Sequence, residues 1–243
     1  MSWKLKSAAS WFTTVLVGVL LSTTNSQQVG TNCSEPRIRR SWDAYNVTEK
    51  ALYLEAVGVA MDRGFQLKFV QLHVEYMSEL EAHRNCMFIY WHRMMLLGYE
   101  NMLRSLDPKY RCLTLPYWDH LSGTARKSAG TCSNMWDCTA AITDSGSRIN
   151  TLTGRAGGLS QSLKIYDTVI RSTASSTVCT NGDPVSHFCG NNTVCAKCMI
   201  RSLKAPSYPA DAFFGSVYKQ IFTSSVYDTF RSYIEQGVHS KLA

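Results

Sequence analysis

Apolar residues recur every three or four positions through the first half of the chain, a spacing that gathers them on one face of a helix. The pattern predicts three consecutive helices, from residue 47 to about 61, from 65 to about 81, and from 88 to 104. Asn46, with Glu49 three positions later, resembles a capping box and supports the start of the first helix.

Residues that stop helices lie at two of the predicted ends, Gly64 after the first helix and Asp107-Pro108 after the third. His73 and His92 fall on the apolar stripes of the second and third helices, so we expect both rings to face inward. The stripes comprise Leu52, Tyr53, Val57, Ala60 and Met61 in the first helix, Phe69, Met77 and Leu80 beside His73, and Trp91, Met95, Leu96, Tyr99 and Leu103 beside His92.

The helical pattern fails from residue 110 to about 150, a segment rich in Ser, Gly, Thr and Cys that predicts a long loop. A weaker helical pattern runs from Leu159 through Leu163 and Tyr166 to Ile170, and residues 177–197 again predict a loop. Residues 226–241 predict a final helix. The fold class is therefore predicted to be mainly α, a helical bundle with long disulfide-pinned loops.

The N-terminal residues 1–26 have the pattern of a secretory signal peptide. Lys4 and Lys6 supply its positive charge, and the apolar run from Trp11 to Leu21 is much shorter than a membrane-spanning helix. We expect residues 27–243 to form the mature domain, secreted into the extracellular space and free of the membrane.

The nine cysteines agree with that compartment, because an oxidising environment favours disulfides. Nine is an odd number, so we expect at least one cysteine to be free or to pair with a partner outside the chain. Cys132 and Cys138 could close a small loop. Glycosylation sequons begin at Asn32, Asn46 and Asn191 and predict a glycoprotein.

The formal net charge of +7 comes mostly from scattered side chains. The short cluster from Arg37 to Arg40 is predicted to be a solvated or locally paired segment, so no nucleic-acid partner is expected.

Three histidines, His73, His83 and His92, lie within twenty residues. Converging neutral imidazoles are a donor set for zinc, copper or iron. Any one of these histidines alone would more often be satisfied by a carbonyl group or water, but three at this spacing favour a metal. The residues by themselves predict a three-histidine metal site in a helical bundle.

The stretch from His83 to Glu100 resembles the first copper-binding signature of the tyrosinase family, the type 3 dicopper proteins. The resemblance implies that His73, His83 and His92 bind the first copper, with Arg93 and Glu100 as supporting residues that hold the helix in place. Pro116-Tyr117-Trp118-Asp119 is similar to a stretch that follows this signature in the family.

The resemblance returns at Tyr233 to His239, which is similar to the helix that carries the first ligand of the second copper. It implies a role for His239 in that second site. Ala243 stands where the family has the next histidine. The expectation is a tyrosinase-like dicopper domain that is C-terminally incomplete, with the first copper site complete and the second cut short.

The resemblance implies a secreted copper oxidoreductase that uses O2 to oxidise monophenols or o-diphenols to o-quinones, with a phenolic small molecule and O2 as partners. The alternative is a catalytically inactive, truncated protein that binds copper or oxygen.

The remaining histidines, His120 and His187, match no ligand position of the family and are predicted to be surface or loop residues. His187 with Cys189, Cys195 and Cys198 has zinc-like spacing, but disulfides are favoured in a secreted chain. Asp119 and Glu235 are predicted to have structural roles.

Overall fold

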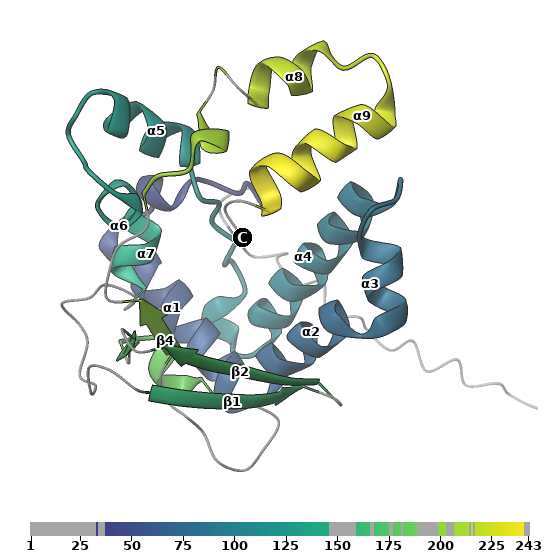
Figure 1. Cartoon of the computed structure of the whole chain (residues 1–243). Coiled ribbons are helices and arrows are strands. Elements are labelled where there is room, and N and C mark those ends of the chain that lie inside the picture. The colour runs from purple at the N-terminus through teal and green to yellow at the C-terminus, as the bar shows by residue number, and fades with distance from the viewer. Residues whose placement is uncertain are drawn as a thin grey trace, which may run out of the picture.

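The computed structural model describes residue 33 and residues 37–145, 159–165, 168–174, 177–180, 182–188, 199–202, 207–213, 215 and 217–240. Helices make up most of this part of the chain, in agreement with the predicted fold class (Figure 1). The α-helices are α1 (Val47–Asp62), α2 (Phe65–Val74), α3 (Tyr76–Ala82), α4 (Phe88–Ser105), α5 (His120–Ser128), α6 (Met135–Cys138), α7 (Ala140–Asp144), α8 (Val217–Thr223) and α9 (Tyr227–Ser232).

The predicted boundaries of α1 and α4 are confirmed. Asn46 and Glu49 form the capping box at the start of α1, each side chain accepting a hydrogen bond from the backbone of the other residue. Gly64 follows the helix at a φ of 73°, in the left-handed region where glycine carries no steric penalty. The Asp107 side chain caps a 3-10 turn beyond α4.

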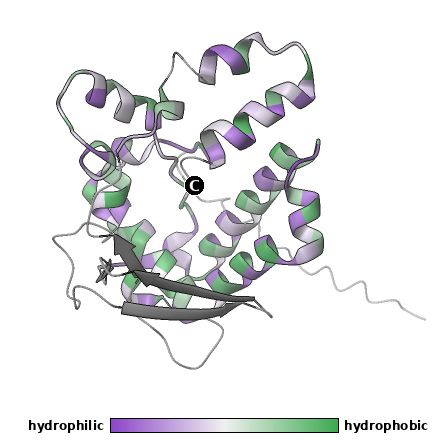
Figure 2. Cartoon of the chain, in the orientation of Figure 1, coloured by the Kyte–Doolittle hydropathy of each residue, from purple (hydrophilic) through white to green (hydrophobic). Residues whose placement is uncertain are grey.

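The main core lies where α1 packs against α4 and the segment that follows it. Its buried residues are Ala56, Val57, Ala60, Leu103, Leu106, Tyr110, Leu113 and Leu115. Figure 2 shows hydrophobic and hydrophilic residues interspersed along these helices, as expected where only one face of a helix covers a core. This core fixes the α4 backbone that carries His92.

The predicted second helix is wrong in one respect, because it is divided at Glu75 into α2 and α3. The Glu75 backbone is extended, with ψ at 137°, and its side chain caps α3 by accepting a hydrogen bond from the Ser78 amide. The break turns α3 away from the line of α2. Met77 and Leu80, which the pattern places inside, are consequently 58% and 52% exposed. Leu96 on α4 is exposed as well.

The chain beyond residue 110 holds more regular structure than predicted. The expected loop contains α5, α6 and α7, and α8 precedes the predicted final helix. The weak helical pattern is wrong, because β1 (Leu159–Ile165) pairs antiparallel with β2 (Thr168–Ala174). The expected loop over residues 177–197 is wrong at its start, where β3 (Thr177–Thr180) pairs with β4 (Met199–Ser202).

Two disulfides are formed among the described cysteines. Cys132–Cys138 closes the small loop predicted from the sequence, and Cys33–Cys112 ties the N-terminal segment to the end of the main core. Cys86 is free and exposed. A partner bound through an unpaired cysteine stays a prediction, and the signal segment 1–26 lies outside the described residues.

The predicted final helix is confirmed, as α9 continues into a π-helical segment, Tyr233–His239. In Figure 1 the yellow α9 lies above α4, and the Tyr227 hydroxyl donates a hydrogen bond to the Cys86 carbonyl beside the start of α4. None of the described helices has the length and apolar character of a membrane span.

Candidate metal centre

Three neighbouring elements present the histidines predicted from the sequence. His73 lies in the last turn of α2, His83 directly follows α3, and His92 lies in the second turn of α4. The break at Glu75 allows this arrangement, because it lets the chain turn between His73 and His83. The three side chains are each partly exposed, so they line the edge of the helical layer and not its core.

The three rings converge on one point. A nitrogen from each ring lies within 4.8 Å of a nitrogen of the other two. His73 Nε2 is 3.3 Å from His92 Nε2. The ring centroid of His83 is 5.0 Å from that of His73 and 5.0 Å from that of His92. This is the set of ligands that the sequence predicts for one metal ion.

The α4 backbone fixes the orientation of the His92 ring. Its Nδ1 lies 2.8 Å from the Phe88 carbonyl oxygen, which can only accept, so Nδ1 must carry the proton. In the neutral ring, Nε2 then has a free lone pair directed at His73. A histidine that donates its other N–H to a carbonyl group in this way is typical of metal ligands.

His83 provides a second test of whether the residues fit a metal. Its Nδ1 is buried and lies 2.8 Å from Glu79 Oε2. A carboxylate beside one ring nitrogen leaves the other nitrogen to bind a metal, an arrangement typical of histidine ligands. The contact is therefore compatible with a cation between the rings of His73, His83 and His92.

The protonation states suit metal binding. Burial lowers the pKa of His73, and the neighbouring His83 and His92 rings lower it further, since two positive charges so close would repel. Burial is also the main reason that the pKa of His92 is lowered. Both rings are therefore held in the neutral form, which is the one that binds a metal.

His239 faces the three-histidine cluster from the end of the π-helical segment. Its ring centroid lies 5.4 Å from that of His92 and 6.2 Å from that of His83. The buried Phe88 ring packs edge-to-face against it at 5.2 Å. Burial lowers the pKa of His239 as well. The structure thus brings His239 to the centre, but its nitrogens lie outside the group of three.

Glu235 connects the segment that carries His239 to the backbone beside His83. The sequence predicts a structural role for Glu235 but not these partners. The carboxylate is only 3% exposed, and Oε1 accepts a hydrogen bond of 2.7 Å from the Arg84 amide. Oε2 pairs with the buried Arg231 guanidinium. Arg84, next to His83, has a φ of 60°, an uncommon value for a residue with a side chain. The contact therefore holds the backbone after His83 in a strained conformation.

The two predicted supporting residues lie on α4, one and eight residues after His92. Glu100 is 1% exposed and accepts hydrogen bonds from Arg39 and the Leu115 amide, and it also pairs with Arg37. These contacts outweigh burial and lower the pKa of Glu100. Glu100 thus joins α4 to the N-terminal segment across 61 and 63 positions of sequence. The prediction of a solvated or locally paired cluster holds for the exposed Arg40, which pairs with Glu49, but it is wrong for the distant pairing of Arg37 and Arg39.

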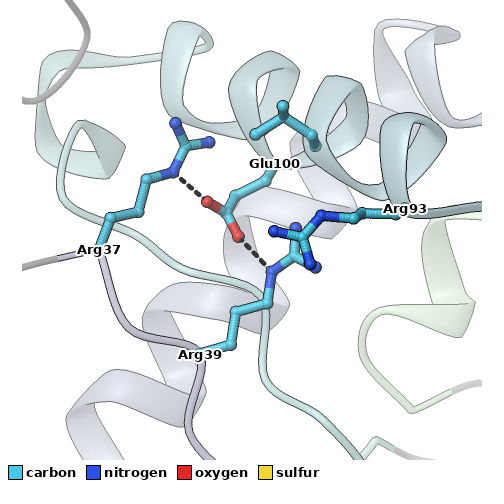
Figure 3. A pocket seen from close by; sticks show the side chains of 5 residues that line it. Arg37, Arg39, Arg93 and Glu100 are labelled. Carbon is cyan, nitrogen blue, oxygen red and sulfur yellow. Dashed lines mark hydrogen bonds and ion pairs between the residues drawn. The ribbon is translucent and has the colours of Figure 1, made fainter. Parts of the chain in front are cut away.

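Arg93 lies in the same area and is exposed. It lines a pocket of about 330 Å³ together with Arg37, Arg39, Leu97 and Glu100 (Figure 3). Within the described part of the chain, Arg93 makes no ion pair. Its predicted supporting role stays a prediction, and the Glu100 oxygens bind the arginines of the N-terminal segment.

The remaining histidines lie away from the cluster. His120 is the first residue of α5, which the Asp119 side chain caps. The Nε2 atom of His120 is 2.6 Å from the Tyr218 hydroxyl. His187 Nδ1 is 2.9 Å from an Asp62 oxygen, and its ring packs on Gly58 of α1. Cys189, Cys195 and Cys198, the other members of the predicted zinc alternative, lie outside the described residues.

Comparison with known proteins gives consistent results. The pattern that defines the common central domain of tyrosinase matches residues 63–241. Grixazone synthase from Streptomyces griseus subsp. griseus is 33% identical over 91 residues, which cover 34% of this chain and 29% of that protein. The tyrosinase-like proteins phomQ1' and phomQ1 from Diaporthe leptostromiformis are each 34% identical over 124 residues, 48% of this chain and 30% and 29% of theirs. The chain spans about 30% of the length of the curated relatives it matches. No solved structure matches it.

Proposed function

The chain belongs to the tyrosinase family, and from this premise we propose that His73, His83 and His92 bind copper for the O2-dependent oxidation of monophenols or o-diphenols to o-quinones. The observation that carries the proposal is the convergence of the three ring nitrogens within 4.8 Å of one another. Copper, when bound, supplies the redox chemistry with O2 that no amino-acid side chain provides.

The chain's own residues hold the ligands ready. The Phe88 carbonyl accepts the Nδ1 proton of His92 and so keeps Nε2 free. Burial favours the neutral form of His73 and His92. Glu235 holds the backbone beside His83 and stands four residues before His239, so it fixes how the two parts face each other. His239 is proposed to contribute to a second copper site.

The test is to load the full chain with copper and measure metal content, O2 uptake and quinone formation with a simple o-diphenol. We expect copper bound by the three-histidine cluster and o-diphenol-dependent O2 uptake. His187→Ala is a suitable control, because this histidine packs against α1, away from the cluster. Copper binding that is unchanged in His92→Ala would overturn the ligand assignment.

A second candidate is a protein that binds copper or O2 without turning over phenols. It is favoured by one observation, that the described residues contain a single group of three metal-ligating side chains, whereas the oxidation uses two coppers. Copper at one equivalent per chain with no O2 uptake on adding an o-diphenol would select this candidate.

We also propose that the protein is secreted and glycosylated. The two disulfides support passage through an oxidising compartment. Asn46 is exposed, and its side-chain oxygen, not its nitrogen, caps α1, so a glycan on the nitrogen is compatible with the cap. Expression in eukaryotic cells should release a glycoprotein that begins near Gln27; retention of residues 1–26 in the product would contradict the proposal.

A further inference from the structure

The pocket on the outer side of α4 has an excess of positive charge. Arg37 and Arg39 from the N-terminal segment and Arg93 from α4 line it, and Glu100 is the acidic residue among its lining side chains. Three guanidinium groups remain charged at any physiological pH. One carboxylate cannot neutralise them, so the pocket keeps a positive potential.

Glu100 is engaged by groups other than Arg93. Its Oε1 pairs with Arg37, and its Oε2 accepts from Arg39 at 3.0 Å and from the Leu115 amide at 2.9 Å. The carboxylate is buried beneath the arginines, which are about one-third exposed at their side chains. Arg37 Nη2 also donates to Asn101 Oδ1 at 2.5 Å. A guanidinium group has five N–H donors, so both paired arginines keep N–H groups beyond these contacts.

Arg93 approaches from the other side of these pairs. It lies seven residues before Glu100 on α4, with Leu97 between them, so all three share one helical face. Figure 3 shows the Arg93 and Arg39 guanidinium groups extending toward the same part of the pocket. Like charges in one pocket repel each other, and an anion between them would remove the repulsion.

The buried Arg104, one turn beyond Glu100 on α4, adds a fourth positive charge to this region. Burial is the main reason that its pKa is lowered, and the positive charge of Arg37 lowers it further. Arg37 is thus close enough to Arg104 for their positive charges to repel.

We propose that this pocket is a binding site for a divalent oxyanion, phosphate or sulfate, held by Arg93 together with the free N–H groups of Arg39 and Arg37. Guanidinium groups bind such oxygens through paired, charge-assisted hydrogen bonds. The pocket of about 330 Å³ has room for the ion with part of its hydration shell. The anion would tie the N-terminal segment to the helix that carries His92.

The experiment is calorimetric titration and thermal unfolding of the full chain with inorganic phosphate, sulfate and acetate, at constant ionic strength and equal copper content. We expect one phosphate or sulfate per chain, weaker acetate binding, and a melting temperature that rises with phosphate concentration. Arg93→Gln should weaken phosphate binding by at least about tenfold, because it removes a charged hydrogen-bond donor. The phosphate affinity of Arg93→Lys should lie between that of Arg93→Gln and that of the unchanged protein. Lysine keeps the positive charge but lacks the paired N–H groups of the guanidinium.

Lys219→Gln is the control, because it removes one positive charge from an exposed position on α8. It should bind phosphate as the unchanged protein does. Arg93 is exposed and has no ion pair among the described residues, so its loss should not prevent folding. The proposal is overturned if the unchanged protein binds phosphate no better than acetate. It is also overturned if Arg93→Gln and Lys219→Gln bind phosphate equally well.

Discussion

His73, His83 and His92 come from twenty consecutive residues, whereas His239 reaches the same centre from the far end of the chain. The first three are placed by α2, α3 and α4, which follow one another directly. His239 is placed by tertiary contacts of its π-helical segment, above all by the Glu235 carboxylate on the Arg84 amide, 151 positions away in sequence. One part of the centre is therefore specified locally and the other by packing.

The difference teaches how each part should fail. Losing a ligand from the local cluster removes metal binding and leaves the surrounding helices in place, because the core of Leu103 and its neighbours lies elsewhere. Losing the Glu235 contact leaves the three ligands present but releases the segment that carries His239. The following variants separate these two kinds of failure.

The largest effect is expected from His92→Ala. This change removes the ligand whose Nε2 faces His73 and whose Nδ1 is bound to the Phe88 carbonyl. We expect copper affinity to fall by more than about 100-fold. Removing a residue that only hydrogen-bonds to a metal ligand costs about 10- to 100-fold, and losing the ligand itself should cost more. Competition with a copper chelator measures the loss, and affinity that stays within tenfold of the unchanged protein would show that the local cluster is not the binding site.

Glu235→Ala should have the next largest effect, this time on stability. It removes the buried one of the two acidic partners of Arg231 and leaves the Arg84 amide without that acceptor. We expect the free energy of unfolding to fall by about 3 kcal/mol, as when one member of a buried ion pair is removed. Urea unfolding measures the change.

Asp228→Ala serves as the matched control, because Asp228 also pairs with Arg231 but its side chain is 75% exposed. Its loss should cost less than about 1 kcal/mol. Equal effects of the two changes would mean that Glu235 is no more important than a surface contact, and that the comparison between local and distant assembly is mistaken.

The smallest effect is expected from His239→Ala on binding of the first copper. The His239 nitrogens lie outside the group of three, so the cluster keeps all its ligands. We expect the affinity for one equivalent of copper to change by less than about tenfold, the lower end of an outer-contact effect. A loss as large as that in His92→Ala would make His239 a ligand of the first metal.

Local sequence signals predicted the helices near the centre well. The capping box at Asn46 and the left-handed Gly64 both occur as expected, because each depends only on neighbouring residues. The break at Glu75 was missed, since a glutamate rarely marks the start of a helix by itself. The spacing of Leu159 and Leu163 does not distinguish a helix from a strand, because positions four apart lie on one face in both. The helix predicted for this segment is therefore wrong, and β1 is formed there.

The local part of the site was predictable from the sequence, and its distant contacts were not. The spacing of His73, His83 and His92 predicted their convergence, which the structure confirms as geometry. The partners of Glu100 were not predictable, because Arg37 and Arg39 stand more than sixty positions away in sequence. Nor could Arg84 be identified as a strained residue held by Glu235, since that requires knowing which distant segments meet.

The Cys33–Cys112 disulfide has a consequence for the denatured chain. It closes a covalent loop across 79 positions that contains all three histidines of the cluster and leaves His239 outside. Such a crosslink lowers the entropy of the unfolded ensemble by an amount equivalent to about 4 kcal/mol. The three imidazoles thus stay within one ring of chain after denaturation, which favours recapture of a metal ion during refolding before His239 returns.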